Sequence, residues 1–425
     1  MKKKILTLLC LGLLFTTSIH QAKATNNENT FSLSSNSAVI MDANTKRVLY
    51  EYNGDTQNYP ASITKVMTML LGVEANDLTK QITISDYGSL SIEVGSSHIS
   101  IMPQETMTMK DAIMAACLVS ANDGANMIAE GVSGTIDNFV TLMNQRAKEL
   151  GCNNTHFMNP HGLHDEEHYT TAIDMARIMS EAVNNDTYLS LTGLDEYEIP
   201  PTNKTDKTRY LYGQNKCMYE ESEFYIPEVM SAKSGYTNQA HHTYVAYAKK
   251  GDVELVVCVM NSNSRDGMYT DLMTLFDYGF ETYSAYDGLT KSLKIPDVDT
   301  SLFTIGGDLK LASSFDCPAI KDNAEKNQFK FTYDVNEELG QTANIGDVVG
   351  KVNLLYGNEV IDSRALVIEK PITNILKVVF NFLLFVLKII VILAVLGVVG
   401  LFAAKKIYTK YRNEQIRKKR RSRKH

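Results

Sequence analysis

The chain has few cysteines, the residues that cross-link small domains through disulfides and that often bind metals. Its 425 residues include no tryptophan, nine prolines and six cysteines. The cysteines are scattered and include no C-x-x-C pair, a pattern that predicts neither a disulfide framework nor a zinc site. A chain of this length builds a core without covalent links, so we expect most of the cysteines to be small buried side chains.

Two hydrolase signatures are also missing. The sequence has no H-E-x-x-H motif, and the cluster of His161, His164 and His168 does not have its spacing. No G-x-S-x-G elbow of an α/β-hydrolase is present either. We therefore expect no metal ion and no other cofactor.

Long apolar runs occur only near the two ends. Residues 1–24 combine three lysines, an apolar stretch and Ala22-Lys23-Ala24, which is typical of a signal peptide cleaved after Ala24. The stretch is short for an uncleaved membrane anchor. A second apolar run lies within residues 371–404 and is interrupted by Lys388. It predicts a linker or amphipathic segment and then a transmembrane helix, with a buried core helix as the alternative.

Charge is distributed unevenly along the chain. The formal net charge is −7, yet residues 405–425 are strongly basic and include Lys418-Lys419-Arg420-Arg421. The positive-inside rule predicts a cytoplasmic tail there, and so a single-pass membrane protein whose folded part lies outside the cytoplasm. A basic segment beside a membrane helix suits anionic lipid headgroups, and the acidic remainder offers no patch for nucleic acid.

Three short motifs indicate the chemistry. They are Ser62-Ile63-Thr64-Lys65, then Ser120-Ala121-Asn122, then Lys233-Ser234-Gly235. This order of S-x-x-K, S-x-N and K-[ST]-G is typical of enzymes that form an acyl-serine intermediate. Residues i and i+3 share a helix face, so Lys65 can meet Ser62. The leucines and methionines that follow would bury this helix, and burial lowers a lysine pKa, which favours a base.

Each motif alone has an ordinary explanation. Ser62 would suit a helix N-cap, Lys65 a solvated surface position and Gly235 a turn. Ser34-Ser35-Asn36 also matches S-x-N, so that motif by itself indicates little. The order of all three motifs, together with their flanks, favours the catalytic interpretation.

The flanks extend the pattern through Ala38–Thr45, Pro60-Ala61, Asn159–Asp165 and Asp277–Phe280. With the motifs, they resemble low-molecular-mass penicillin-binding proteins of the D-alanyl-D-alanine carboxypeptidase family, over residues of about 30 to 370. The resemblance implies a serine peptidase that removes the terminal D-alanine from peptidoglycan stem pentapeptides. It also implies covalent inhibition by β-lactam antibiotics such as penicillin.

The resemblance implies a fold as well. Residues 25–285 would form an α/β penicillin-recognising (transpeptidase-like) domain, which is an antiparallel sheet flanked by helices. Residues 286–370 would form a small all-β domain, a spacer or docking module, as short alternating runs also indicate. From the periodicity we expect helices and a β-hairpin in the first domain, and five strands in the second. They are helices at Met109–Glu130, Thr141–Leu150 and Thr171–Val183, a hairpin of Thr243–Lys249 with Val253–Met260, and strands at Ser301–Thr304, Leu309–Ala312, Gln328–Tyr333, Val348–Tyr356 and Ala365–Ile368.

The resemblance assigns catalytic roles to the first two motifs. Ser62 would be the nucleophile, Lys65 the general base and Ser120 the proton relay. Asn122 would bind the substrate amide. The backbone N–H groups of Ser62 and Tyr236 would form the oxyanion hole.

The third motif would bind the substrate carboxylate. The resemblance implies a charge from Lys233 and hydroxyls from Ser234 and Thr237, with Gly235 allowing close approach of the substrate backbone. Two departures from the family pattern stand here. Ser234 replaces the commoner threonine, and Met268 occupies the position at which many relatives have a carboxylate-binding arginine. Arg265, three residues away, is the candidate replacement.

Several other functions share these motifs. A D,D-endopeptidase or a weak transpeptidase would use the same acylation residues. A class A β-lactamase would carry S-D-N and a deacylating glutamate, whereas the second motif here is Ser120-Ala121-Asn122 and no such glutamate is evident. A catalytically silent wall-binding protein is the alternative outside enzymes, and the complete set of motif residues argues against it.

Overall fold

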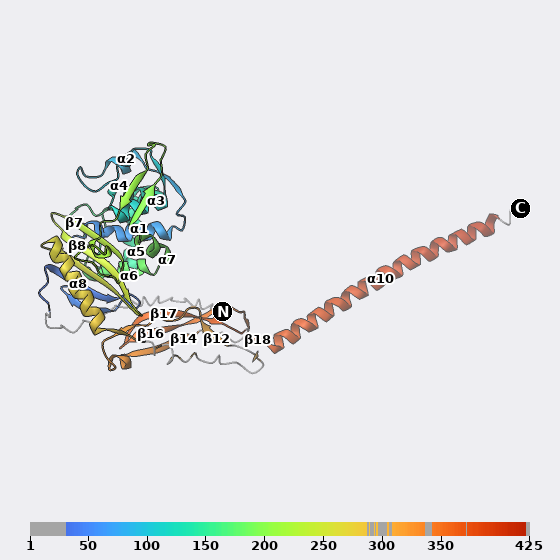
Figure 1. Cartoon of the computed structure of the whole chain (residues 1–425). Helices are drawn as coiled ribbons and strands as arrows, with labels where there is room; N and C mark the ends of the chain where they lie inside the picture. Colours follow the sequence, from blue (N-terminus) through green and yellow to red (C-terminus); the bar gives the residue numbers. More distant parts are fainter. Residues whose placement is uncertain are drawn as a thin grey trace, which may run out of the picture. The chain divides into compact units, whose positions relative to one another are not determined.

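The computed structural model describes residues 31–286, 308–335, 342–370 and 372–421, and residues 289, 293, 295, 304 and 305 between them. The expected signal peptide, most of the expected strand at 301–304 and the end of the basic tail lie outside these residues. The chain divides into two compact units (Figure 1). The first is Met1–Leu289 with Asp316–Phe329 and Tyr356–Ile361, and the second is Thr290–Phe315, Lys330–Leu355 and Asp362–His425.

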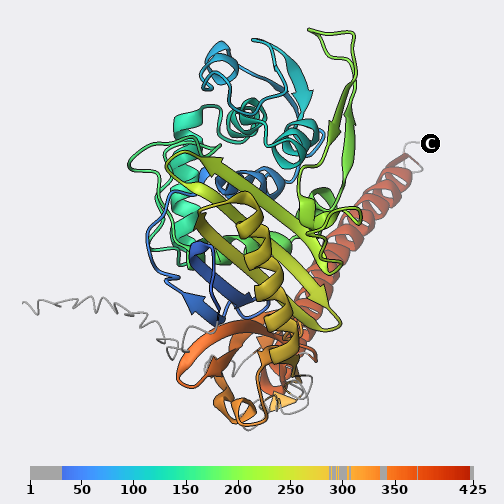
Figure 2. The same ribbon diagram turned by 60° about the vertical axis from the view of Figure 1, so that its left-hand side comes forward.

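A five-stranded antiparallel sheet forms the centre of the first unit (Figure 2). Its strand order is β2-β1-β9-β8-β7. The earliest strand, β1, therefore lies between β2 and the late strand β9, and β7 forms an edge. The strands are β1 (Ser35–Asp42), β2 (Val48–Tyr52), β7 (Val229–Thr237), β8 (His241–Lys250) and β9 (Val253–Ser262).

Helices cover both faces of this sheet. α6 (Ala172–Val183) packs against β1, β8 and β9 on one face, and α8 (Arg265–Thr282) packs against the same strands on the other. Side chains of β9 alternate between the two cores: Val256 and Cys258 belong to one, and Val257 and Val259 to the other. Burial on both faces explains why β9 is a continuous apolar run in the sequence.

Further helices extend the core on the α6 side. Helix α1 (Lys65–Glu74), which is buried from Lys65 to Val73, packs against α3, α4 and α6. Two hairpins, β3–β4 and β5–β6, lie on this helical region, the second against α3. The remaining elements are α2 (Asp86–Leu90), α3 (Met109–Leu118), α4 (Asn122–Ser133), α5 (Ile136–Glu149), α7 (Asp186–Thr192), β3 (Gln81–Thr83), β4 (Thr106–Thr108), β5 (Glu196–Ile199), β6 (Arg209–Tyr212), η1 (Ala61–Thr64) and η2 (Lys216–Met218).

Polar caps set the helix starts. Thr108 accepts the N–H of Asp111, whose carboxylate accepts the N–H of Thr108, so α3 begins with a complete capping box. Thr171 likewise accepts the N–H of Asp174 at the start of α6.

The single helix predicted over Met109–Glu130 is wrong. The structure has two helices, α3 and α4, and the chain turns between them at Ser120, which has a left-handed φ of 58°. The N–H of Ala121 donates to the carbonyl of Ala115 and closes the turn. Apolar side chains continue on both sides of the break, which explains why the pattern indicated one helix.

The C-terminal region is built of short strands and one long helix. Its larger sheet has the order β12-β17-β16-β14, and a smaller one has β11-β18-β15. β16 coincides with the expected strand, and the all-β character is as predicted. The strands are β11 (Thr304–Ile305), β12 (Leu309–Leu311), β14 (Phe329–Val335), β15 (Thr342–Ala343), β16 (Val348–Tyr356), β17 (Glu359–Ile368) and β18 (Ile372–Asn374); β10 (Ser284–Ala285) pairs with β13 (Ala319–Ile320) in the first unit.

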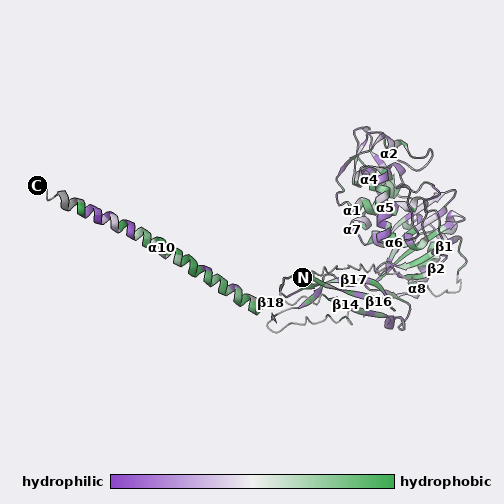
Figure 3. Cartoon of the chain, turned by 180° about the vertical axis from the view of Figure 1, so that it is seen from behind, coloured by the Kyte–Doolittle hydropathy of each residue, from purple (hydrophilic) through white to green (hydrophobic). Residues whose placement is uncertain are grey.

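The long helix is α10 (Ile375–Arg421). Its segment Val378–Ile416 is long and apolar enough to cross a membrane. Figure 3 shows the helix apolar over its first part and hydrophilic toward its end. This agrees with the predicted apolar segment followed by a basic tail.

Candidate active site

Ser62 and Lys65 lie at the junction of η1 and α1. Ser62 is in the 3₁₀ turn, and Lys65 is the first residue of α1. The turn is held from outside by a loop, because Gly162 lies so close to the carbonyl of Ala61 that no side chain would fit there. Ser62 stays partly exposed, whereas Lys65 is completely buried.

The Lys65 amine has three close oxygen neighbours. Its Nζ lies 3.0 Å from Ser62 Oγ, 2.7 Å from Asn122 Oδ1 and 2.7 Å from the carbonyl oxygen of His161. Burial, assisted by the nearby Lys233 ammonium and opposed by Asp123, lowers the pKa of Lys65 well below its ordinary value. The first motif therefore meets the second at a group poised to hold or release a proton.

Ser120 faces Lys233 from the turn between α3 and α4. Lys233 Nζ lies 3.0 Å from Ser120 Oγ and 2.8 Å from the carbonyl of Ser234. Burial lowers the pKa of Lys233 to about 8, against an opposing influence of Cys117. The left-handed turn at Ser120 brings its hydroxyl to β7, and so the second motif meets the third.

The edge strand β7 passes very close to Ser62. A Cβ added to Gly235 would lie 2.7 Å from the backbone nitrogen of Ser62 and 2.5 Å from Thr243 Oγ1. Thr243, opposite Gly235 on β8, donates its hydroxyl to the carbonyl of Pro60 and so ties the sheet to η1. Only glycine permits this close approach of β7 to the turn at Ser62.

The carboxylate candidates lie at the end of β7 and beyond. Ser234 and Thr237 are partly exposed on the strand, and Thr237 Oγ1 accepts the N–H of Ala240. Arg265 is exposed at the start of α8, where its charge, after burial, helps to lower the pKa of His242. Met268 is buried against the sheet. Its side chain thus belongs to the core rather than to the site.

Two histidines support the site from behind. His161 presents its carbonyl to Lys65, and His168 contacts Thr64 Oγ1 through Nε2 at 2.9 Å. The N–H of Met158 donates to His168 Nδ1, so Nε2 carries the proton and donates to Thr64. Burial lowers the pKa of His168 to about 3 and keeps the ring neutral. Sequence reasoning missed the role of His161, since a backbone carbonyl leaves no residue signature.

Comparison with known proteins identifies the family. The sequence profile described as D-alanyl-D-alanine carboxypeptidase matches residues 21–264. The chain belongs to this family. The D-alanyl-D-alanine carboxypeptidase DacF of Bacillus subtilis is 35% identical over 290 residues, which cover 67% of this chain and 72% of the relative. DacA of Escherichia coli is 27% identical over 350 residues, covering 79% of this chain and 83% of DacA.

Solved structures agree with the D-alanyl-D-alanine carboxypeptidase family. Penicillin-binding protein 5 of Haemophilus influenzae superposes with a TM-score of 0.60 at 25% identity, over 81% of this chain and 98% of that one. The family, the fold class and the serine D-alanyl-D-alanine carboxypeptidase activity expected from the sequence are thereby confirmed. Within the residues that the structure describes, no cluster of three or more histidine, cysteine or acidic side chains is placed to hold a metal.

Proposed function

We propose that this carboxypeptidase removes the terminal D-alanine of peptidoglycan stem pentapeptides through an acyl-enzyme on Ser62. The main support for this proposal is the buried Lys65 amine, which lies 3.0 Å from Ser62 Oγ and has a lowered pKa. β-Lactams would acylate the same hydroxyl and block the enzyme. Residues 25–285 would supply all of this chemistry, and residues 286–370 would act as a spacer or docking domain.

The contacts of Lys65 support its role as general base. A neutral amine has two N–H groups and one lone pair. Asn122 Oδ1 and the His161 carbonyl can only accept, so they take both N–H groups. The lone pair is left for the hydroxyl of Ser62, whose proton it receives as the oxygen attacks the substrate carbonyl carbon.

The negative oxygen of the tetrahedral intermediate would be bound by the N–H groups of Ser62 and Tyr236. The close approach of Gly235 to Ser62 supports this oxyanion hole. Ser120, which accepts a hydrogen bond from Lys233, would relay a proton to the departing amine nitrogen of D-alanine. Water then hydrolyses the acyl-enzyme. Asn122, which accepts from Lys65 through Oδ1, would donate Nδ2 to a substrate amide carbonyl.

The terminal carboxylate would be bound at the exposed end of β7. It loses water on entering the site, so charged and hydroxyl partners must replace that hydration. Lys233, Ser234 and Thr237 are the candidates on the strand. Arg265 would join them from the start of α8, because its charge reaches His242, the cross-strand neighbour of Tyr236.

We further propose a single-pass topology with the peptidase outside the cell membrane. The signal-like N-terminus and the apolar segment of α10 support it. The basic residues 405–425 would lie in the cytoplasm against anionic lipid.

A fluorescent penicillin tests the proposal directly. The wild-type chain should become covalently labelled, and Ser62→Ala should not label although it folds, as circular dichroism would show. Slow loss of the label distinguishes a carboxypeptidase from a β-lactamase, which would release it rapidly. Release of D-alanine from a pentapeptide completes the test. Labelling of Ser62→Ala would exclude the acyl-serine mechanism as assigned.

A further inference from the structure

A long excursion of the chain borders the second motif. It runs from Ser85 through α2 to Glu105, between strands β3 and β4. Several of its large apolar side chains face solvent: Tyr87 and Leu90 are mostly exposed, and Val94 is fully exposed. Ser100 and Gln104 have left-handed backbones, with φ of 57° and 61°. Ile101 is buried in the core and Ile99 packs against it, so polar contacts must fix the exposed remainder of this segment.

One helix, α4, holds the near side of the excursion. Glu130 accepts the N–H and hydroxyl of Ser85, and Asn126 donates to the carbonyl of Gly88. The buried carboxylate of Asp123 accepts the N–H groups of Ile99 and Ile101. The N–H of Asn122 donates to the carbonyl of Ser97 at 2.8 Å. The excursion thus bonds directly to Asn122, the residue that contacts Lys65.

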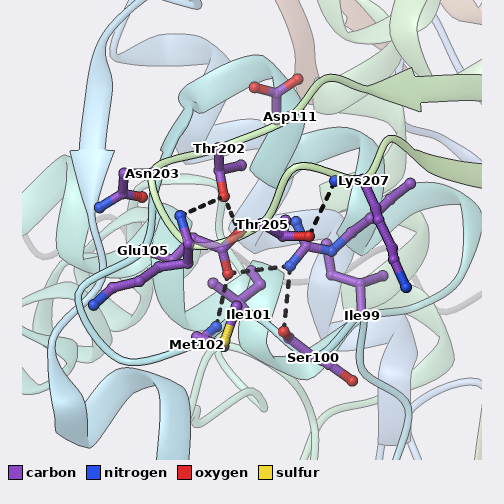
Figure 4. Close-up of polar contacts among 12 residues, drawn as sticks. Ile99, Ser100, Ile101, Met102, Glu105, Asp111, Thr202, Asn203, Thr205 and Lys207 are labelled. Carbon is purple, nitrogen blue, oxygen red and sulfur yellow. Dashed lines mark hydrogen bonds and ion pairs between the residues drawn. The ribbon is translucent and has the colours of Figure 1, made fainter.

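The far side is held by the β5–β6 hairpin, which lies about one hundred residues later in the chain. The Glu105 carboxylate is completely buried. It accepts two N–H groups of Arg209, at 2.9 and 3.1 Å, the hydroxyl of Thr202 and the N–H of Met102 (Figure 4). Arg209 also donates to the carbonyl of Ser100 at 3.3 Å. Asn203 brackets the same turn, since it accepts from Thr106 and donates to Gln104.

We propose that Glu105 and Arg209 are positioning residues for acylation: they fix the excursion so that it holds Asn122 in register with Lys65 and the substrate. This inference rests on the proposed role of Asn122. The link is short. Arg209 and Glu105 fix residues 100–102, Asp123 holds residues 99 and 101 from the other side, and residue 97 bonds Asn122.

The planar guanidinium of Arg209 suits this positioning role. Its guanidinium reaches both oxygens of Glu105 and a backbone carbonyl at once, which a lysine ammonium cannot reproduce with the same geometry. Burial alone would raise the pKa of Glu105, but the bonds from Arg209, Thr202 and Met102 hold it below its ordinary value. Glu105 therefore stays ionised and keeps all its partners.

The test compares Arg209→Met with Arg146→Met. Arg146 is the control, because it also bridges two carboxylates, those of Glu74 and Glu181, and its side-chain exposure of 20% is close to the 16% of Arg209. The carboxylates of Glu74 and Glu181 are partly exposed, whereas that of Glu105 is buried. We expect Arg209→Met to slow labelling by a fluorescent penicillin roughly 10- to 100-fold, as small misplacements of a site do. Arg146→Met should lower thermal stability while labelling at the wild-type rate.

A double-mutant cycle separates positioning from general weakening. In an Asn122→Ala background, Arg209→Met should slow labelling no further, because the group that it positions is already missing. Amide exchange at Ile99 and Ile101 should accelerate in Arg209→Met and in the milder Arg209→Lys, which serves if the first variant does not fold.

Three outcomes would overturn the inference: wild-type labelling by a folded Arg209 variant, an equal loss in the Asn122→Ala background, or an equal loss in Arg146→Met. Failure of the wild-type chain to label would instead refute the proposed function.

Discussion

Gly235→Ala offers the sharpest test of the oxyanion hole. The new methyl group would lie 2.7 Å from the Ser62 nitrogen, 2.5 Å from Thr243 Oγ1 and 3.1 Å from Ala61 Cβ. These separations are shorter than van der Waals contact, so β7 and η1 must move apart. The N–H groups of Ser62 and Tyr236, which we propose as the oxyanion hole, would then no longer bind one oxygen together. Losing one oxyanion donor costs about 10²- to 10³-fold in rate, and we expect a loss of this size in labelling by fluorescent penicillin.

Stability should change much less than reactivity. Overpacking of this kind costs about 1–3 kcal/mol, which a thermal melt would detect as a modest shift. Gly251→Ala is the control: Gly251 has a φ of 62° at the β8–β9 turn and open space around it, so its variant should lose stability without losing reactivity. A Gly235→Ala enzyme that labels as fast as Gly251→Ala would refute the reasoning.

Three further predictions address charge, specificity and anchoring. The labelling rate should rise with pH as Lys65 loses its proton, since the neutral amine is the base, and it should fall again near pH 8 as Lys233 becomes neutral. In Lys233→Arg the alkaline fall should move to higher pH. A pH–rate profile without that shift would contradict the role of Lys233. Amidation of the terminal carboxylate of a D-alanyl-D-alanine peptide should reduce kcat/KM about 10- to 150-fold. Thr237→Val should reduce this difference in kcat/KM between the acid and the amide. Equal turnover of acid and amide would point to an endopeptidase. A chain ending at Lys370 should stay in the supernatant after ultracentrifugation and label like the full chain, because no site residue lies in α10; an inactive product would show that the helix is needed for the fold.

Local patterns in the sequence predicted the elements that local interactions form. The β8–β9 hairpin follows from two apolar runs around Gly251, and α6 follows from the apolar periodicity of Thr171–Val183. The pairing of β1 with β9 has no local signal, because it joins segments at opposite ends of the first unit. The break at Ser120 was missed for a related reason: contacts with β7 and with the loop at Ser97 stabilise a turn that the apolar period does not reveal.

The candidate site divides in the same way. The candidate side chains fall into recognisable motifs, and the structure brings them together in two groups: Lys65 contacts Ser62 and Asn122, and Lys233 contacts Ser120. The carbonyl of His161 was not predictable, since any residue carries one. The ion pair of Glu105 and Arg209 was not predictable either, because it forms only where a loop contacts a hairpin about one hundred residues later in the chain.

The strand order of the main sheet also constrains when the protein can fold. β1 is an inner strand whose partner β9 ends only at Ser262, and β7, which carries Lys233, reaches β1 only through β8 and β9. Closing so large a loop is slow, and little of the sheet can form before its last strand is available. The main sheet therefore cannot be completed until the chain has been synthesised through Ser262. A chain that stops short of Ser262 would lack the strand that joins β7 and its Lys233 to β1, so activity should begin only when the peptidase unit is nearly complete.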